Sequence, residues 1–193
     1  MCRCLFTAVL FVSTLTFTAV AQDGPKDAVV LIIRHAEDGG TGHDLAPRGQ
    51  ERAEAYKDYF IKFTVDSKRL EPQVIFAAKD SKQSHRPRLT VEPFAKAEKL
   101  RIDTRFGNDQ SAELAAELRA SEQGKRILIC WRHPYVPDLL RALGANPENF
   151  LPHGKWPGSV YDWVILLSYD QDGRLIPESS RRINEHLMPE DSQ

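Results

Sequence analysis

Runs of apolar residues alternate along the chain with longer segments in which apolar residues recur every three or four positions. The uninterrupted runs are rich in Val, Ile and Leu, which is typical of strands buried on both faces of a parallel sheet. They predict strands over about 28–34, 73–78, 126–131 and 160–168, with a short last strand near 174–176.

The segments between these strands have the periodicity of helices. In residues 50–63, for example, Ala53, Tyr56, Phe60 and Phe63 recur on one helical face. Further helices are predicted within 81–100 and over 111–121 and 137–143. The alternation predicts an α/β fold, a three-layer α/β/α sandwich with a mostly parallel central sheet and an antiparallel edge strand.

The first 21 residues have a different pattern. Arg3 precedes an apolar stretch that ends in Ala19-Val20-Ala21, a small-x-small cleavage site. We expect a secretory signal peptide over residues 1–21 and therefore an exported protein, periplasmic or secreted. The alternative is an uncleaved membrane anchor, but the apolar stretch is shorter than the roughly 20 residues that a bilayer requires. Residues 22–193 are expected to form one domain.

Composition excludes several classes of protein. Of 193 residues, 41% are hydrophobic and 27% charged, and the net charge is −1. These values are ordinary for a soluble globular domain and give no reason to expect a nucleic-acid partner. We expect no stable membrane insertion after signal cleavage. The oligomeric state is left open. Cleavage would leave Cys130 as the one cysteine, so no intramolecular disulfide is expected.

Two of the predicted strands end in the same dipeptide, Arg34-His35 and Arg132-His133. In open α/β sheets, ligands bind beyond the carboxyl ends of the strands. A neutral imidazole can attack phosphorus, and the planar guanidinium group suits phosphoryl oxygens. A further arginine, Arg86, follows the second strand. This pattern predicts a phosphate pocket that works without a metal or cofactor.

Four motifs, taken in order, resemble those of one family. Arg34-His35-Ala36-Glu37 resembles an Arg-His-Gly/Ala-Glu signature, and residues 45–50 resemble a Leu-Thr-Pro-x-Gly helix start. Arg86, four residues before Thr90, and residues 128–144 around His133 complete the series. The chain resembles the histidine phosphatase superfamily (phosphoglycerate-mutase-like), and in particular its small exported bacterial-type members, over nearly the whole of residues 22–193.

The resemblance implies a metal-independent phosphatase that hydrolyses a phosphomonoester or a related small phosphorylated substrate. His35 would be the phosphorylated nucleophile, and Arg34, Arg86 and His133 would form the phosphate pocket. The chain departs from the family in having Trp131-Arg132 before the second histidine. Arg132 could add positive charge to the pocket or point away from it. Arg88 is an alternative to Arg86, whose spacing from Thr90 fits the motif better.

The proton donor is the least determined residue, because its position varies across the family. A carboxylic acid must protonate the leaving oxygen and then activate water. Asp138 is the first candidate, five residues after His133 at the start of a predicted helix. The helix dipole alone would also favour an acid there. Glu37, which could also contact substrate, is the second candidate and Asp109 the third.

Two other functions remain open at this point. A phosphoryl-ligand-binding pseudoenzyme of the same fold would explain the unsettled proton donor and the unusual Trp131-Arg132 pair. A phosphomutase would share the first chemical step. The compact span between Arg86 and His133, and the predicted export, argue against the mutase. No motif identifies the leaving group of the substrate.

Overall fold

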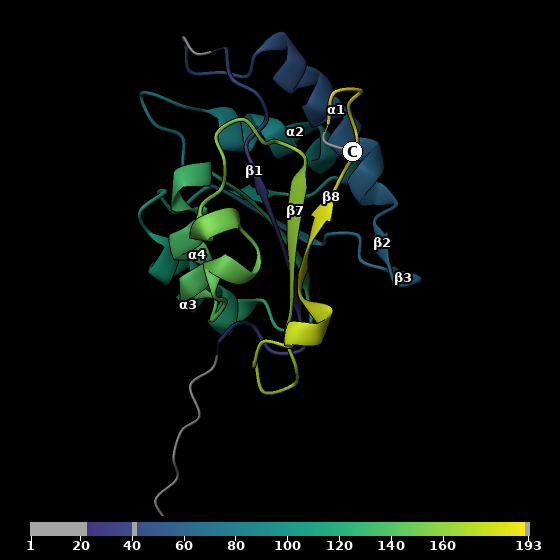
Figure 1. Cartoon of the computed structure of the whole chain (residues 1–193), viewed down its shortest axis with the longest axis vertical. Coiled ribbons are helices and arrows are strands. Elements are labelled where there is room, and N and C mark those ends of the chain that lie inside the picture. Colours follow the sequence, from purple (N-terminus) through teal and green to yellow (C-terminus); the bar gives the residue numbers. More distant parts are fainter. Residues whose placement is uncertain (1–22, 40–41, 192–193) are drawn as a thin grey trace, which may run out of the picture.

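The computed structural model describes residues 23–39 and 42–191 (Figure 1). The signal peptide predicted over residues 1–21 lies outside the described residues. Within the described ranges, no helix is both long and apolar enough to cross a membrane.

A six-stranded sheet forms the centre of the molecule, with the strand order β5-β4-β6-β1-β7-β8. Strands β1, β6, β4 and β5 run parallel, whereas β7 is antiparallel to β1 and β8 is antiparallel to β7. The predicted mostly parallel sheet with an antiparallel edge strand is therefore confirmed. The strands are β1 (Val29–Arg34), β4 (Val74–Ala77), β5 (Ile102–Asp103), β6 (Arg126–Trp131), β7 (Trp163–Ser168) and β8 (Arg181–Asn184).

Helices cover both faces of this sheet (Figure 1). Val30 and Ile32 of β1 pack in one core cluster with residues of α3 and α4. The alternate residues Leu31 and Ile33 pack in a second cluster with α1 and α2. Because successive side chains of a strand point to opposite faces, one apolar run serves both cores. The helices are α1 (Pro47–Ile61), α2 (Arg86–Glu98), α3 (Ser111–Ser121) and α4 (Val136–Ala142).

Short elements complete the described fold. A two-stranded sheet of β2 (Thr64–Val65) and β3 (Lys68–Arg69) follows α1. Single 3₁₀ turns are η1 (His133–Tyr135), η2 (Pro147–Asn149), η3 (Pro152–Gly154) and η4 (Pro177–Ser179).

The predicted last strand near 174–176 is wrong. Leu175 makes only an isolated bridge with Tyr169, and the edge strand β8 begins at Arg181, after the turn η4. The sequence of β8 has one apolar residue, Ile183, because an edge strand buries only part of its surface. That pattern is too weak to distinguish the strand from a polar loop.

Candidate active site

The adjacent parallel strands β1 and β6 bring the two histidines together at the carboxyl ends of the strands. Arg34 at the end of β1 pairs with Trp131 at the end of β6, and the His35 N–H donates to the Trp131 carbonyl at 3.0 Å. His133 follows two residues later, as the first residue of η1. The centroids of the two imidazole rings are 6.2 Å apart, with 56° between the ring planes.

His35 is held as a neutral imidazole with a defined tautomer. Its side chain is buried, and Nδ1 lies 2.8 Å from the Ala36 carbonyl oxygen. A carbonyl oxygen only accepts, so Nδ1 bears the hydrogen and Nε2 of the neutral ring keeps its lone pair. Burial lowers the pKa of His35 to about 4, an effect that the Ala36 hydrogen bond opposes and the positive charge of Arg34 reinforces. His35 therefore has the form of a nucleophile at neutral pH.

His133 has a similar electrostatic environment. Burial, followed by the positive charges of Arg34 and Arg132, lowers its pKa to about 4. Its buried Nδ1 has no hydrogen-bond partner among the described residues. His133 also lines a cavity of about 550 Å³ formed with α4 and the segment from Asn146 to Trp156. The charge of Arg132, whose direction the sequence left open, thus acts on this imidazole.

Arg34 lies between the sheet edge and the loop over residues 157–161. Its Nη1 donates to the carbonyl oxygens of Gly158 and Val160, both at 2.9 Å, and of Pro157 at 3.3 Å. The guanidinium stacks over the Tyr161 ring, 3.8 Å from its centroid. Its positive charge lowers the pKa of both His35 and His133.

Arg86 and Arg88, the two arginines considered for the phosphate pocket, have different partners. Arg86 begins α2, donates from Nη2 to the Gly42 carbonyl at 2.7 Å, and adds to the positive field that lowers the pKa of His35. Arg88 forms ion pairs with Asp80 at 2.8 Å and Glu92 at 3.5 Å. Both ion pairs engage the guanidinium of Arg88.

Thr90 joins the segment after His35 to the first turn of α2. Its Oγ1 accepts the Ala36 N–H at 2.9 Å and donates to the Arg86 carbonyl at 2.8 Å. Its hydroxyl is fully buried. One side chain thus fixes the backbone next to His35 and the start of the helix that bears Arg86, which explains the four-residue spacing between Arg86 and Thr90.

Gly49 lets α1 approach the same segment. A Cβ at this position would clash with the Glu37 carbonyl oxygen, which also accepts the Ala46 N–H at 3.0 Å. The contact is with backbone, so a side chain here would displace the loop that follows His35.

The three carboxylates considered as proton donors all have other contacts or lie on the surface. Asp138 is exposed on the first turn of α4, where it accepts from Arg141 at 2.8 Å, and it lines the same cavity as His133. Glu37 accepts three hydrogen bonds from Arg52 at 2.8–3.1 Å. Asp109 is exposed, just before α3.

Asp38 is a carboxylate that the sequence analysis did not consider. It is half-buried, and its Oδ2 lies 3.4 Å from Nη1 of Arg86. Its negative charge opposes the lowering of the pKa of both His35 and His133. The available signal was its position three residues after His35, within the same short loop.

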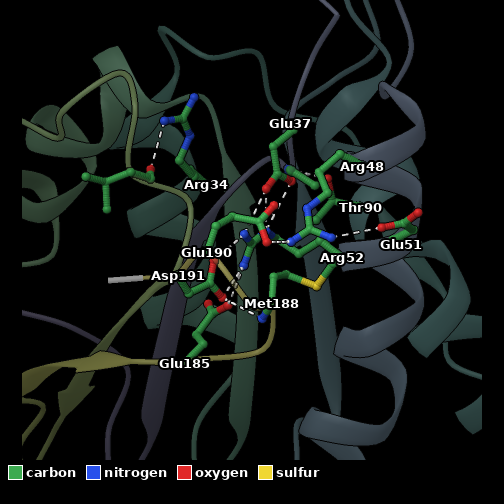
Figure 2. Close-up of polar contacts among 12 residues, drawn as sticks. Arg34, Glu37, Arg48, Glu51, Arg52, Thr90, Glu185, Met188, Glu190 and Asp191 are labelled. Carbon is green, nitrogen blue, oxygen red and sulfur yellow. Dashed lines mark hydrogen bonds and ion pairs between the residues drawn. The ribbon is translucent and has the colours of Figure 1, made fainter. Parts of the chain in front are cut away.

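A buried cluster of charged side chains contacts the loop that follows His35 (Figure 2). Arg52 of α1 lies between Glu37 and Asp191, whose two oxygens accept from it at 2.6 and 3.0 Å. Burial disfavours the charge of Arg52, but the hydrogen bonds to Asp191 and Glu37 outweigh it and raise the pKa. Glu185, 3.9 Å from Arg52, accepts from Tyr56 at 2.8 Å. Figure 2 shows Arg34 extending away from this cluster.

No local pattern predicts this cluster, because its members are far apart in the chain: Arg52 is separated from Glu37 by 15 positions and from Asp191 by 139. As for metals, the described ranges contain no group of three or more His, Cys, Asp or Glu side chains that could hold an ion.

Comparison with known proteins establishes the fold. No protein-family model matches the chain, and no curated protein matches it either. Phosphoserine phosphatase from Entamoeba histolytica, solved with 3-phosphoglyceric acid, has a TM-score of 0.57 at 14% identity. This match covers 83% of our chain and 100% of that one. A point mutant of that enzyme, in complex with phosphoserine, gives a TM-score of 0.55 at 12% identity, over 83% of this chain and 98% of that one.

The protein histidine phosphatase SixA, solved with tungstate, matches with a TM-score of 0.51 at 15% identity, over 81% of this chain and 97% of that one. These structural neighbours are phosphatases. At such low identities, the similarity shows that the chain has their fold.

Proposed function

We propose that this protein is a phosphatase of the histidine phosphatase superfamily, which hydrolyses a small phosphorylated substrate through a phosphohistidine on His35. The observation on which the proposal rests is the pair of imidazoles 6.2 Å apart at one sheet edge, one of them a neutral ring whose Nδ1 is engaged by Ala36. This arrangement leaves Nε2 as the atom that can attack phosphorus.

The cationic groups around the pair supply the rest of the chemistry. The phosphoryl oxygens would be bound by Arg34, Arg86 and His133, which stabilise the charge that spreads over them during transfer. Burial strengthens these interactions, since charges act more strongly where water is excluded. The Nε2–phosphorus bond forms as the bond to the leaving oxygen breaks, and attack by water then releases inorganic phosphate and restores the imidazole.

The structural neighbours support the substrate class. One was solved with 3-phosphoglyceric acid, its mutant with phosphoserine, and another with tungstate, a tetrahedral anion. We therefore propose a small phosphomonoester or related phosphoryl compound as substrate here. The pseudoenzyme and mutase alternatives are distinguished by turnover and by transfer to a second acceptor.

Substitution of His35 with Asn tests the proposal. The Asn amide can still donate to the Ala36 carbonyl but has no nucleophilic nitrogen, so the variant is expected to fold and to lose turnover. Wild-type enzyme quenched during turnover should yield a phosphorylated peptide containing His35, and EDTA should leave the rate unchanged. Activity at the wild-type level in His35→Asn would reject the mechanism, and phosphate binding without turnover in the wild type would favour the pseudoenzyme.

We also propose that the protein is exported, on the evidence of its N-terminal sequence. Expression of the full chain in a bacterium with an intact export pathway should give a mature protein that begins at Gln22, in the periplasm or medium. Retention of Met1 on a membrane-bound product would favour the anchor instead.

A further inference from the structure

The loop that follows the nucleophile contains a carboxylate among the cationic groups of the site. The side chain of Asp38 approaches Arg86, with 3.4 Å between Oδ2 and Nη1, and remains partly exposed at 28%. In the described part of the chain, the charges that act most strongly on His35 and His133 include one carboxylate, that of Asp38. It also acts on Arg34.

The backbone fixes this position. Residue 38 forms an antiparallel bridge with Leu45, and the neighbouring Glu37 carbonyl accepts the Ala46 N–H at 3.0 Å. Arg52 holds the Glu37 side chain on the other side with three hydrogen bonds. These contacts anchor the loop at residues 37 and 38, so Asp38 has a fixed position three residues after His35.

Two other carboxylates near the site, those of Glu37 and Asp138, are placed differently. Glu37 has its carboxylate occupied by Arg52, and Asp138 is bound by Arg141 on an exposed helical turn. The side chain of Asp138 is 67% exposed, compared with 28% for Asp38.

We propose that Asp38 is the general acid and base of the reaction, a proposal that rests on the function proposed above. As the bond between phosphorus and the leaving oxygen breaks, that oxygen takes the proton of Asp38, while Nε2 of His35 forms its bond to phosphorus. In the second step, a water oxygen attacks phosphorus and passes one proton to the Asp38 carboxylate. The bond between Nε2 and phosphorus breaks, and phosphate leaves with the remaining water proton.

The dependence on the leaving group tests this role. An alkyl phosphate needs a proton on its leaving oxygen, whereas dinitrophenyl phosphate releases a stable phenolate without one. We expect Asp38→Asn to reduce kcat/KM for the alkyl phosphate by about 10²–10⁴-fold. The loss for dinitrophenyl phosphate should be less than about tenfold, since only the nucleophile and the cations are needed for that step.

The second step gives an independent readout. With dinitrophenyl phosphate, Asp38→Asn should release a burst of about one equivalent of phenolate per site, followed by slow turnover, because water activation is lost while the phosphoenzyme still forms. Asp38→Glu keeps the acid and is expected to restore part of the alkyl phosphate activity.

Asp138→Asn is the matched control, since it makes the same chemical change at the candidate that the sequence favoured. In this variant, kcat/KM for both substrates should stay close to the wild-type values. Equal losses on the two substrates in Asp38→Asn, without rescue by Asp38→Glu, would show a structural role and overturn the proposal. A leaving-group-dependent loss in Asp138→Asn instead would assign the acid to Asp138. Failure of the phosphohistidine mechanism is distinguishable, because His35→Asn would then retain turnover on both substrates.

Discussion

The buried neutral state of His35 predicts a specific dependence of stability on pH. The pKa of His35 is about 4 in the folded protein and 6.5 in the unfolded chain. At about pH 5 the unfolded chain is protonated at this residue, whereas the folded protein is still neutral there. Because the pKa of His35 is lower in the folded protein, the free energy of unfolding is highest above the unfolded-state pKa. It falls as the pH drops from that value toward the folded-state pKa.

The magnitude follows from the interval. The interval from the unfolded pKa of 6.5 down to about pH 5 is about 1.5 pH units. Each unit changes the free energy of unfolding by about 1.36 kcal/mol, so protonation of His35 in the unfolded chain should lower it by about 2 kcal/mol at about pH 5. Below about pH 4 its contribution should level off, because the folded form is then protonated as well.

Urea unfolding of wild type and His35→Asn at about pH 7.5 and about pH 5 measures this contribution. The wild type should lose about 2 kcal/mol more than the variant over this interval, since His133 and the carboxylates are common to both proteins. Phosphate buffers must be avoided, because an anion that binds the folded site would stabilise it. The same pH dependence in both proteins would refute the reasoning that burial holds His35 neutral.

Four substitutions test other parts of the site. Arg86→Ala should reduce kcat/KM by about 10²–10³-fold, and Arg88→Ala, which removes only partly exposed ion pairs, by less than about threefold; the reverse order would exchange their roles. Thr90→Val leaves the Ala36 N–H without an acceptor and should cost about 1–3 kcal/mol in urea unfolding, with a lower kcat; an unchanged midpoint would exclude this link. Arg52→Met leaves buried carboxylates without a positive partner and should lower the free energy of unfolding by about 3–5 kcal/mol. An unchanged free energy of unfolding would show that the charge of Arg52 does not compensate these carboxylates.

The elements that the sequence predicted well are those with a strong apolar pattern. The strand at residues 126–131 has the predicted boundaries because burial on both faces of the sheet leaves a continuous apolar run. The helix at residues 111–121 has them because Leu114 and Leu118 recur on one buried face. Strand β8 and the pair β2–β3 were missed because they are short and largely polar.

The same distinction applies to the site. The Arg-His dipeptides could be located from sequence because each lies at the end of a strand. The contacts of Thr90 with Ala36 and of Arg52 with Asp191 depend on packing between distant segments, which no local pattern specifies. The placement of Asp38 beside Arg86 likewise depends on how α2 packs against the loop after His35.

The central claim is that the side chains of His35, His133, Arg34 and Arg86 surround one tetrahedral anion. A crystal structure of the protein with tungstate measures this directly. The account predicts tungsten oxygens within hydrogen-bond distance of both guanidiniums and of His133, with tungsten in line with Nε2 of His35. Tungstate bound elsewhere, with these four side chains directed away from a common centre, would contradict it.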